Sequence, residues 1–349
     1  MLHARRAVPR LAHLSAHLSS SASASASAAA RIEALATQDE GGRGIAALVL
    51  QGELAASASA LAGARRVGII TGFPCLITEE GVVRFDSPQE TDGPPGAVAI
   101  AKALLALDAS TEVVIMTDDI NGPVVAACIE AMGTGGGARR PDLVCFPPRA
   151  ALSEGEWQER WRDLLAPAGG FDHLVAIERA GPATDGKYYT MSMKDMSFMM
   201  APLDELFLMA QEATGGRVLT TGIGDGGNEV GMGKVLGAVH EHIKNGVTIG
   251  CVTPADFLVT SSVSNWGGYA LAAALAAEVL QRDATLVGDE VLDLMVPTTE
   301  EATAYVDASL AAGARDGISG TAEPEWSVDG MPRAVHDSML LRIRAAVLG

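Results

Sequence analysis

The chain has 349 residues, of which 48% are hydrophobic and 19% are charged, so it can bury a sizeable core and does not have the composition of a disordered protein. Its formal net charge of -18 argues against nucleic acid or an anionic membrane as the main partner. No apolar run is long enough to span a bilayer, and the four cysteines form no CxxC pair, which is typical of a reducing compartment.

The first 30 residues differ in composition from the rest of the chain. Arg5, Arg6 and Arg10 are basic, no acidic residue precedes Glu33, and serine and alanine fill residues 19–30. This pattern predicts an organellar transit peptide over residues 1–30, with the mitochondrion as first choice and the chloroplast as the alternative. A disordered tail without any targeting role is a further alternative. We expect one folded domain over residues 40–349.

Apolar runs and helical patterns alternate along most of the chain. The runs that predict strands cover residues 66–71, 112–116, 143–146, 173–177, 218–219, 247–252 and 257–260. The patterns that predict helices cover residues 45–61, 97–107, 123–132, 154–165, 202–213, 228–244, 271–280, 290–295, 299–312 and 335–347. Strands and helices that alternate at this spacing form right-handed βαβ units. The sequence therefore predicts an α/β fold with an open, mostly parallel, doubly wound sheet and helices on both faces.

A glycine-rich stretch, residues 220–234, lies between a predicted strand and a predicted helix. Ligands bind at such places in open α/β sheets, and the N–H groups of a helix start favour an anion. The run from Gly222 to Gly227 satisfies G-x-G-x-x-G, which is a weak signal for a bound phosphate. Asp225 and Glu229 stand inside the turn, and their charge would oppose a phosphate. They suit a site that handles protons, an ammonium group or a metal.

Polar residues follow other predicted strands as well. Residues 90–96 combine two acids with glycines and prolines before a predicted helix, and Thr91 or Asp92 can cap that helix. The same loop can equally face a ligand. Glu178 and Arg179 come directly after the predicted strand at residues 173–177.

Six segments together resemble one known family, the D-glutamate cyclases. They are residues 90–96 (ETDGPPG), 176–181 (AIERAG), 185–189 (DGKYY), 222–234 (GIGDGGNEVGMGK), 264–269 (SNWGGY) and 316–320 (DGISG). The resemblance implies a hydro-lyase of the mitochondrial matrix that converts D-glutamate to 5-oxo-D-proline and water. Such a cyclisation requires no ATP and no redox cofactor, and the partner is a small amino-acid substrate.

The chemistry of cyclisation assigns roles to particular residues. The amine must lose its proton and the γ-carboxyl must be polarised. We therefore expect Asp225 or Glu229 to bind the amine and act as base, and Glu178 to act as general acid. Arg179 would hold the α-carboxylate, because its fork of donors suits a carboxylate. The remaining predicted substrate-binding residues are Thr91, Asp92, Tyr188, Asn228 and Asn265, together with Gly226 and Gly227, whose N–H groups would form an oxyanion hole.

Each of these roles has a structural alternative. Glu178 and Arg179 can form an ion pair, and Asp225 can have only the structural role of stabilising the turn. Tyr188 can pack in the core, and Asn265 can cap a helix. The carboxylates of Asp92, Asp118, Asp225 and Glu229 can instead hold Mg²⁺. A non-catalytic module that binds a nucleotide or phosphate is the alternative function. The alanine-rich helix at residues 271–280 can pack within the domain or across a homo-oligomer.

Overall fold

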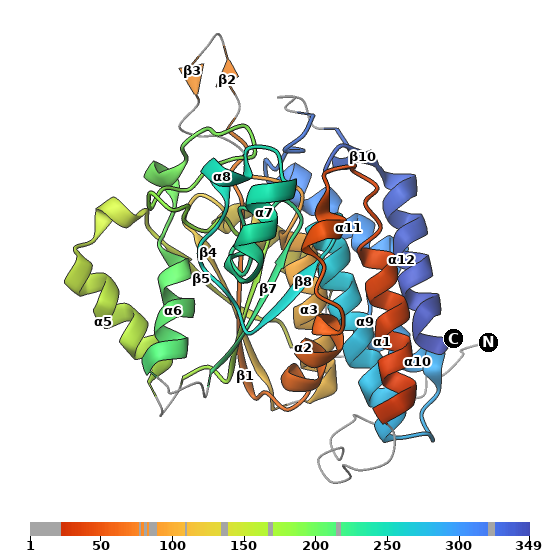
Figure 1. Cartoon of the computed structure of the whole chain (residues 1–349). Coiled ribbons are helices and arrows are strands. Elements are labelled where there is room, and N and C mark those ends of the chain that lie inside the picture. Colours follow the sequence, from red (N-terminus) through yellow and green to blue (C-terminus); the bar gives the residue numbers. More distant parts are fainter. Residues whose placement is uncertain are drawn as a thin grey trace.

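The fold is built on one six-stranded sheet (Figure 1). A computed structural model describes residues 22–76, 78–79, 82–83, 89–108, 110–133, 139–166, 170–213, 218–319 and 325–349. The strands of the sheet are β1 (Arg66–Thr71), β4 (Glu112–Asp118), β5 (Asp142–Phe146), β6 (His173–Ile177), β7 (Leu219–Gly224) and β8 (Phe257–Thr260). Their order is β5-β4-β1-β6-β7-β8, and all the pairings are parallel. In the described part of the chain, two short antiparallel pairs lie outside it: β2 (Thr78–Glu79) with β3 (Val82–Val83), and β9 (Ser327–Val328) with β10 (Met331–Pro332).

The order of the strands reverses between β1 and β6. From β1 the chain adds β4 and β5 on one side, and it then returns to add β6, β7 and β8 on the other. Open α/β sheets bind ligands at such a switch point, outside the carboxyl ends of the strands. Gly72 follows β1 and Glu178 follows β6, so these two positions flank the expected site.

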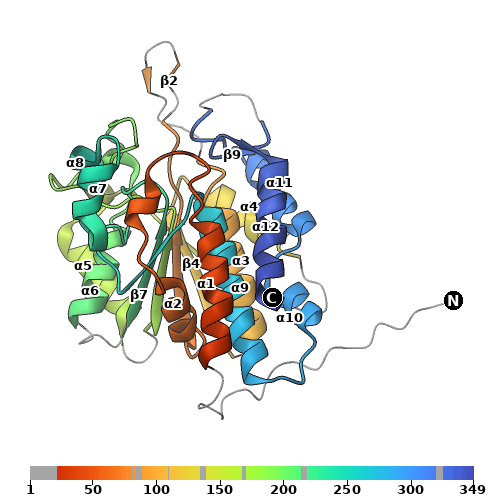
Figure 2. The ribbon, with the colours of Figure 1, turned by 45° about the vertical axis from the view of Figure 1, so that its right-hand side comes forward.

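Helices cover both faces of the sheet, as Figure 2 shows. They are α1 (Ala22–Ala36), α2 (Glu53–Leu61), α3 (Pro94–Leu107), α4 (Gly122–Ala131), α5 (Glu154–Leu165), α6 (Leu203–Ala213), α7 (Leu236–His242), α8 (Gly246–Ile249), α9 (Ser264–Arg282), α10 (Gly288–Met295), α11 (Thr299–Ala311) and α12 (Arg333–Leu348). On one face α3 and α9 contact the strands, and α1 and α12 pack on α9. On the other face α5 and α6 pack against the sheet through Trp157, Trp161 and Phe207. Successive side chains of a strand point to opposite faces of the sheet. Ile69 of β1 therefore packs in the core on one face, and Ile70 packs in the core on the other.

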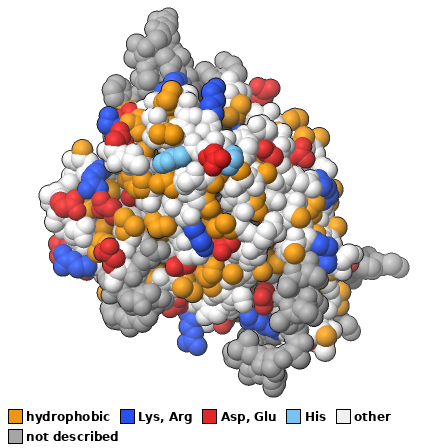
Figure 3. All heavy atoms as spheres, viewed as in Figure 1, with side chains coloured by type: hydrophobic (Ala, Val, Ile, Leu, Met, Phe, Trp, Pro, Cys, Tyr) orange, Lys and Arg blue, Asp and Glu red, His pale blue; other side chains and the backbone are white. Residues whose placement is uncertain are grey.

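The outer surface seen in Figure 3 mixes hydrophobic, acidic and basic side chains without one broad area of a single charge. None of the helices that the structure describes is long and apolar enough to cross a membrane.

The predicted α/β class and most of the predicted elements are confirmed, and three predictions around the glycine-rich stretch and the first helix are corrected. Residues 247–252 do not form a strand, because Gly246 lies against the backbone of Val239 and holds this segment on α7. The helix predicted to begin at residue 228 begins at Leu236, since Gly227 and Gly231 adopt positive φ angles that a helix cannot continue. Gly52, also at positive φ, splits the helix predicted over residues 45–61.

The folded part of the chain starts earlier than the predicted boundary at residue 40. Residues 1–21 of the predicted transit peptide lie outside the described residues. Helix α1 follows, and its Ile32 and Ala36 are 0% and 1% exposed in the core against α9 and α12. The Glu33 carboxylate accepts hydrogen bonds from the backbone N–H groups of Gly52 and Leu54, at the start of α2. Helix α1 is thus an integral part of the domain.

Candidate active site

A cavity of about 470 Å³ opens at the carboxyl ends of β1, β6 and β7. Its size falls within the roughly 300–1,000 Å³ that is typical of small-molecule sites. Among the residues that the structure describes, the charged side chains lining it are Arg43, Glu90, Glu178, Lys194, Asp225, Glu229 and Asp329. The cavity therefore lies at the switch point of the sheet and is strongly acidic.

Asp92 ties two helix starts together beside this cavity. Its Oδ1 accepts hydrogen bonds from the N–H groups of Gly93 and Asn265 at 3.0 and 2.7 Å, and its Oδ2 accepts one from Ser264 at 2.8 Å. Gly93 precedes α3, and Ser264 begins α9, so the positive ends of both helix dipoles meet at one carboxylate. The side chain is 3% exposed. Asp92 is thus fixed by the fold as well as placed near the site.

Glu178 enters the same space directly after β6. Its φ angle is 41°, an uncommon conformation for a residue other than glycine. A side chain at position 93 would place its Cβ 2.7 Å from the Cβ of Glu178, so the close approach of the two loops requires Gly93. The Glu178 side chain is buried, and its Oε2 has no hydrogen-bond partner among the described residues.

In the glycine-rich turn after β7, backbone N–H groups donate hydrogen bonds to a carboxylate of the same turn. The Glu229 carboxylate accepts hydrogen bonds from the N–H groups of Asp225, Gly226 and Gly227 at 3.1, 2.6 and 2.7 Å. The predicted oxyanion hole at Gly226 and Gly227 is corrected, since those donors are already engaged by a carboxylate. A phosphate would face the same obstacle, and no helix begins at this turn. The structure gives no support to the nucleotide-binding alternative.

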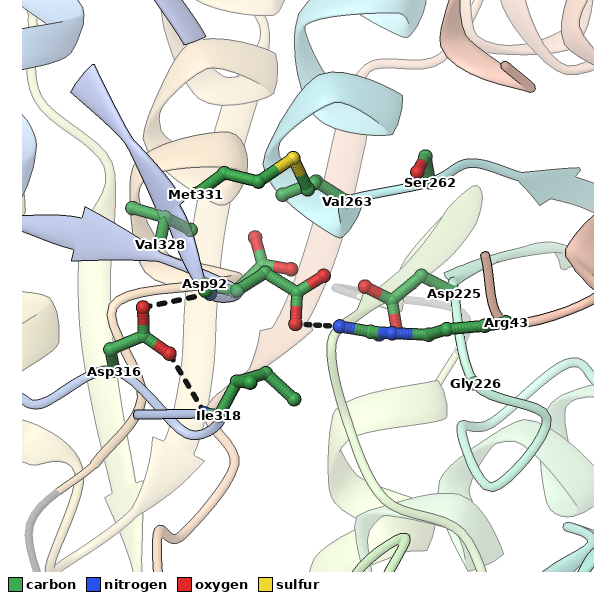
Figure 4. Close-up of polar contacts among 12 residues, drawn as sticks. Arg43, Asp92, Asp225, Gly226, Ser262, Val263, Asp316, Ile318, Val328 and Met331 are labelled. Atoms are coloured by element: carbon green, nitrogen blue, oxygen red, sulfur yellow. Dashed lines mark hydrogen bonds and ion pairs between the residues drawn. The ribbon is translucent and has the colours of Figure 1, made fainter. Parts of the chain in front are cut away.

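Arg43, which was not among the predicted site residues, supplies positive charge to the cavity. It lies between α1 and the short 3₁₀ helix at Ile45–Leu48, where Asp39 holds the N–H groups of Arg43 and Gly44. Its guanidinium donates to Asp225 at 2.9 Å and forms an ion pair with Asp329. Figure 4 shows the side chain extending past Asp225 toward the segment that carries Val328. The run Gly41-Gly42-Arg43-Gly44 is the signal that could have drawn attention to it.

Three further acids near the cavity, Glu90, Asp316 and Asp329, were not predicted as site residues. Glu90 and Asp316 lie in segments that carry the family resemblance. Glu90 lines the cavity, and its backbone pairs with Arg315. Asp316 accepts hydrogen bonds from the N–H groups of Ile318 and Gly330, and so it shapes the loop that presents Asp329 (Figure 4). The site is thus completed by the C-terminal part of the chain.

Crowding in the interior shifts the protonation of these acids. Burial, reinforced by the neighbouring carboxylates, raises the pKa of Glu178 well above its usual range. Burial also raises the pKa of Asp225 strongly, and the Arg43 charge opposes this shift. For Asp92, burial raises the pKa to about 6 against the opposing effect of the Asn265 and Ser264 N–H donors. The pKa of Glu90 rises to about 8 through burial and the charge of Asp92. The cluster can therefore hold protons near neutral pH.

Arg179 does not face the cavity, which corrects its predicted role as a substrate clamp. Its side chain is fully buried and forms an ion pair with Asp118, with a 2.9 Å contact to Oδ1. It also donates to the carbonyl oxygen of Ala201 at 2.7 Å. An arginine that is already paired in the interior cannot bind a substrate without leaving Asp118 as an unpaired buried charge. Arg179 therefore has a structural role in an ion pair, but its partner is Asp118, and the predicted pair with Glu178 is wrong.

The other predicted substrate-binding residues mostly support the loops of the site. Tyr188 is 5% exposed and donates its hydroxyl hydrogen to Asp204, away from the cavity lining. Asn265 accepts from the N–H groups of Gly93 and Gly96 and donates to the Thr91 carbonyl oxygen. The Thr91 hydroxyl donates to Ser327. Asn228 does line the cavity, although its amide nitrogen donates to the carbonyl oxygen of Tyr189.

Three of the predicted acids converge closely enough to share a ligand. Asp92, Glu178 and Asp225 each offer a carboxylate oxygen, and these oxygens lie within 4.8 Å of one another. Two of the acids predicted as Mg²⁺ ligands fall outside this group. Asp118 is paired with Arg179, and the Glu229 carboxylate is held by the turn.

Comparison with known proteins agrees with this picture. A family model described as D-glutamate cyclase-like, C-terminal, matches residues 32–344. The chain is 35% identical over 328 residues to "D-glutamate cyclase, mitochondrial" of Homo sapiens, an alignment that covers 89% of this chain and 50% of that protein. This chain thus spans about half the length of that curated relative. Since the family model covers nearly the whole domain, with Arg43 and the three converging acids inside the match, the chain belongs to the D-glutamate cyclase-like C-terminal family.

Proposed function

We propose that this chain catalyses the cyclisation of D-glutamate to 5-oxo-D-proline and water. The observation that carries the proposal is the convergence of three carboxyl groups, those of Asp92, Glu178 and Asp225. Glu178 and Asp225 line a cavity that Arg43 also lines. Membership of the D-glutamate cyclase-like family and the name of the human relative support it. Glutamate carries two carboxylates and one ammonium group, which are the groups that such a site can receive.

The reaction needs proton movement rather than net proton supply. A C–N bond forms between the amine and the γ-carbon, and a C–O bond of the γ-carboxyl breaks. The ammonium nitrogen gives up two protons, and the departing oxygen ends with two, so water leaves and no proton is gained or lost overall. Carboxyl groups whose pKa values lie near the working pH are suited to this transfer.

The residues of the cavity divide this work between them. Arg43 binds the α-carboxylate, since a guanidinium matches a carboxylate in geometry and charge. Asp225 accepts a proton from the amine. Glu178, whose raised pKa lets it carry a proton at neutral pH, polarises the γ-carboxyl. Holding the amine and the γ-carboxyl of one molecule together supplies much of the rate through proximity.

The test is to incubate the full chain with D-glutamate or L-glutamate and to measure 5-oxoproline by chiral chromatography. We expect product from the D form, and we expect Asp225→Asn to reduce kcat by about 100-fold or more, as loss of a general base does. Asp163→Asn, an exposed acid on α5, is the matched control and should leave kcat unchanged. Folded protein that converts neither enantiomer would rule out the proposal.

We also propose that the protein acts in the mitochondrion. The arginine-bearing, acid-free start of the sequence and the mitochondrial name of the human relative support this. Residues 1–30 fused to a fluorescent protein should direct it to mitochondria. Delivery to chloroplasts, or no delivery at all, would contradict the proposal.

A further inference from the structure

We propose that Asp92, Glu178 and Asp225 bind one divalent cation that prefers oxygen ligands: Mg²⁺, Mn²⁺ or Ca²⁺. Their three carboxylate oxygens lie within 4.8 Å of one another, and the side chains come from three different loops at the switch point. Oxygen ligands around such cations lie about 2.0–2.6 Å from the metal, so two ligands on opposite sides are about 4–5 Å apart. The spacing therefore fits a shared cation with little rearrangement.

Glu178 provides an independent indication that something binds there. It is 5% exposed, and its Oε2 has no hydrogen-bond partner among the described residues. Buried polar side chains almost always have a partner, and an unpaired buried carboxylate is costly. Glu178 belongs to the group of converging acids, so its side chain points at the other two. A cation held by all three would supply the missing partner.

The other two acids keep a carboxylate oxygen with bonding capacity. In Asp92, Oδ2 accepts only the Ser264 N–H among the hydrogen bonds of the described residues, and a carboxylate oxygen has two lone pairs. In Asp225, the Arg43 guanidinium contacts Oδ1, which leaves Oδ2 for a metal. The backbone donors and Arg43 fix both side chains, which resembles the way outer-shell hydrogen bonds orient metal ligands.

The charge balance of the cavity also favours a cation. Among the described residues that line it, five are acidic (Glu90, Glu178, Asp225, Glu229 and Asp329) and two are cationic (Arg43 and Lys194). A bound cation favours the ionised form of the acids beside it. A glutamate brings two more carboxylates, so further positive charge would ease its entry. The group contains no histidine or cysteine, and carboxylates alone suit hard cations rather than zinc. Glu178 and Asp225 are ionised when they hold the cation, so the cation, rather than a proton on Glu178, would then polarise the γ-carboxyl. This Lewis-acid role rests on the proposed function, whereas binding does not.

The test measures binding directly. The full chain is treated with EDTA, dialysed, and titrated with Mn²⁺ while electron paramagnetic resonance reports the free ion; Mg²⁺ and Ca²⁺ are then tested as competitors. We expect one Mn²⁺ per chain. Glu178→Gln and Asp225→Asn should each weaken binding by about tenfold or more, as loss of a metal-site group does. Circular dichroism checks that each variant is folded, and the two variants test the site separately.

Asp163→Asn is the matched control. It removes one negative charge from an exposed position on α5 outside the cavity lining. Solvent and salt screen such a charge, so the affinity should change by less than about threefold. No saturable Mn²⁺ binding by the folded chain would overturn the inference. So would unchanged affinity in both Glu178→Gln and Asp225→Asn, or an equal loss in Asp163→Asn.

The two proposals can fail separately. A chain that forms 5-oxoproline but binds no Mn²⁺ overturns the metal inference and leaves the proposed function standing. A chain that binds Mn²⁺ through Glu178 and Asp225 but converts neither enantiomer supports the metal inference and rules out the proposed function.

Discussion

At the scale of single residues, the site is defined by acids that crowd around one guanidinium. Burial acts to lower the pKa of Arg43, but Asp225, Glu178 and the acids beyond them raise it above its usual value, so the side chain stays charged. Its two ion pairs join the loop after α1, the turn after β7 and the C-terminal segment before β10. One side chain thus connects three parts of the chain across the cavity.

Arg43→Gln should impair substrate binding more than it impairs the chemical step. We expect the KM for D-glutamate to rise about 10- to 100-fold, because a hydrogen bond to a charged group contributes about 1.5–3 kcal/mol. Steady-state kinetics with each variant measures this. Arg65→Gln, at an exposed arginine outside the cavity lining, should leave KM unchanged. A folded Arg43→Gln protein with the KM of the wild type would show that another group binds the carboxylate.

At the scale of elements, the site depends on how closely α3 and α9 approach each other. A Cβ at Gly268 of α9 would lie 2.7 Å from the Cα and the carbonyl oxygen of Gly96 in α3. This close crossing brings the N-terminal ends of both helices to Asp92, and Asn265 links them through the N–H groups of Gly93 and Gly96. The position of the acid is therefore set by the packing of two helices.

Gly268→Ala should destabilise the protein and distort the site together. The added methyl group meets backbone, which cannot turn aside, so we expect a loss of about 1–3 kcal/mol in the free energy of unfolding. Gly237→Ala is the control: it lies in α7 with no atom within 4 Å of the added Cβ, and it should be neutral or add up to about 1 kcal/mol. Urea denaturation compares the two. Equal stability of Gly268→Ala and the wild type would mean that the helices can separate without cost.

A buried histidine links two central strands and makes stability depend on pH. His173 of β6 shares a 2.8 Å hydrogen bond with the Thr221 hydroxyl of β7, and its ring stacks on Phe257. Burial lowers the pKa of His173 to about 3. Between this value and the usual pKa of about 6.5, the unfolded chain binds the extra proton, so stability falls as pH decreases.

The comparison that isolates this effect is wild type against His173→Gln. We expect the stability of the wild type relative to the variant to fall by about 1 kcal/mol between pH 7 and pH 5.5. Urea denaturation at a series of pH values measures the difference, which removes the contributions of the other titrating groups. A difference that does not change with pH would mean that His173 can be protonated in the folded state.

At the scale of the whole molecule, α1 closes the core and prepares the site. It packs on α9 and α12, its Glu33 binds the start of α2, and the loop after it carries Asp39 and Arg43. Residues 22–30 of α1 fall within the predicted transit peptide, and the whole helix precedes the predicted start of the domain at residue 40. The helix nevertheless contributes to both the core and the cavity, so the predicted start of the domain falls too late in the chain.

A chain that begins at residue 40 should be far less stable than one that begins at residue 22. Removing α1 exposes the apolar faces of α9 and α12, and loss of one fully buried side chain such as Ile32 already costs about 2–5 kcal/mol. Thermal denaturation of the two chains measures the difference. The same transition temperature in both would show that α1 contributes nothing to the core.

The sequence by itself determined the α/β class, most strands and helices, and the acids that follow the central strands. It could do so because burial leaves a period along each element, and because the carboxyl ends of parallel strands share one edge. Only the tertiary structure decided which charges face one another: Arg43 enters the cavity, Arg179 turns to Asp118, and Glu229 binds its own turn. These pairings depend on packing between segments far apart in the chain, so no local pattern of residues predicts them.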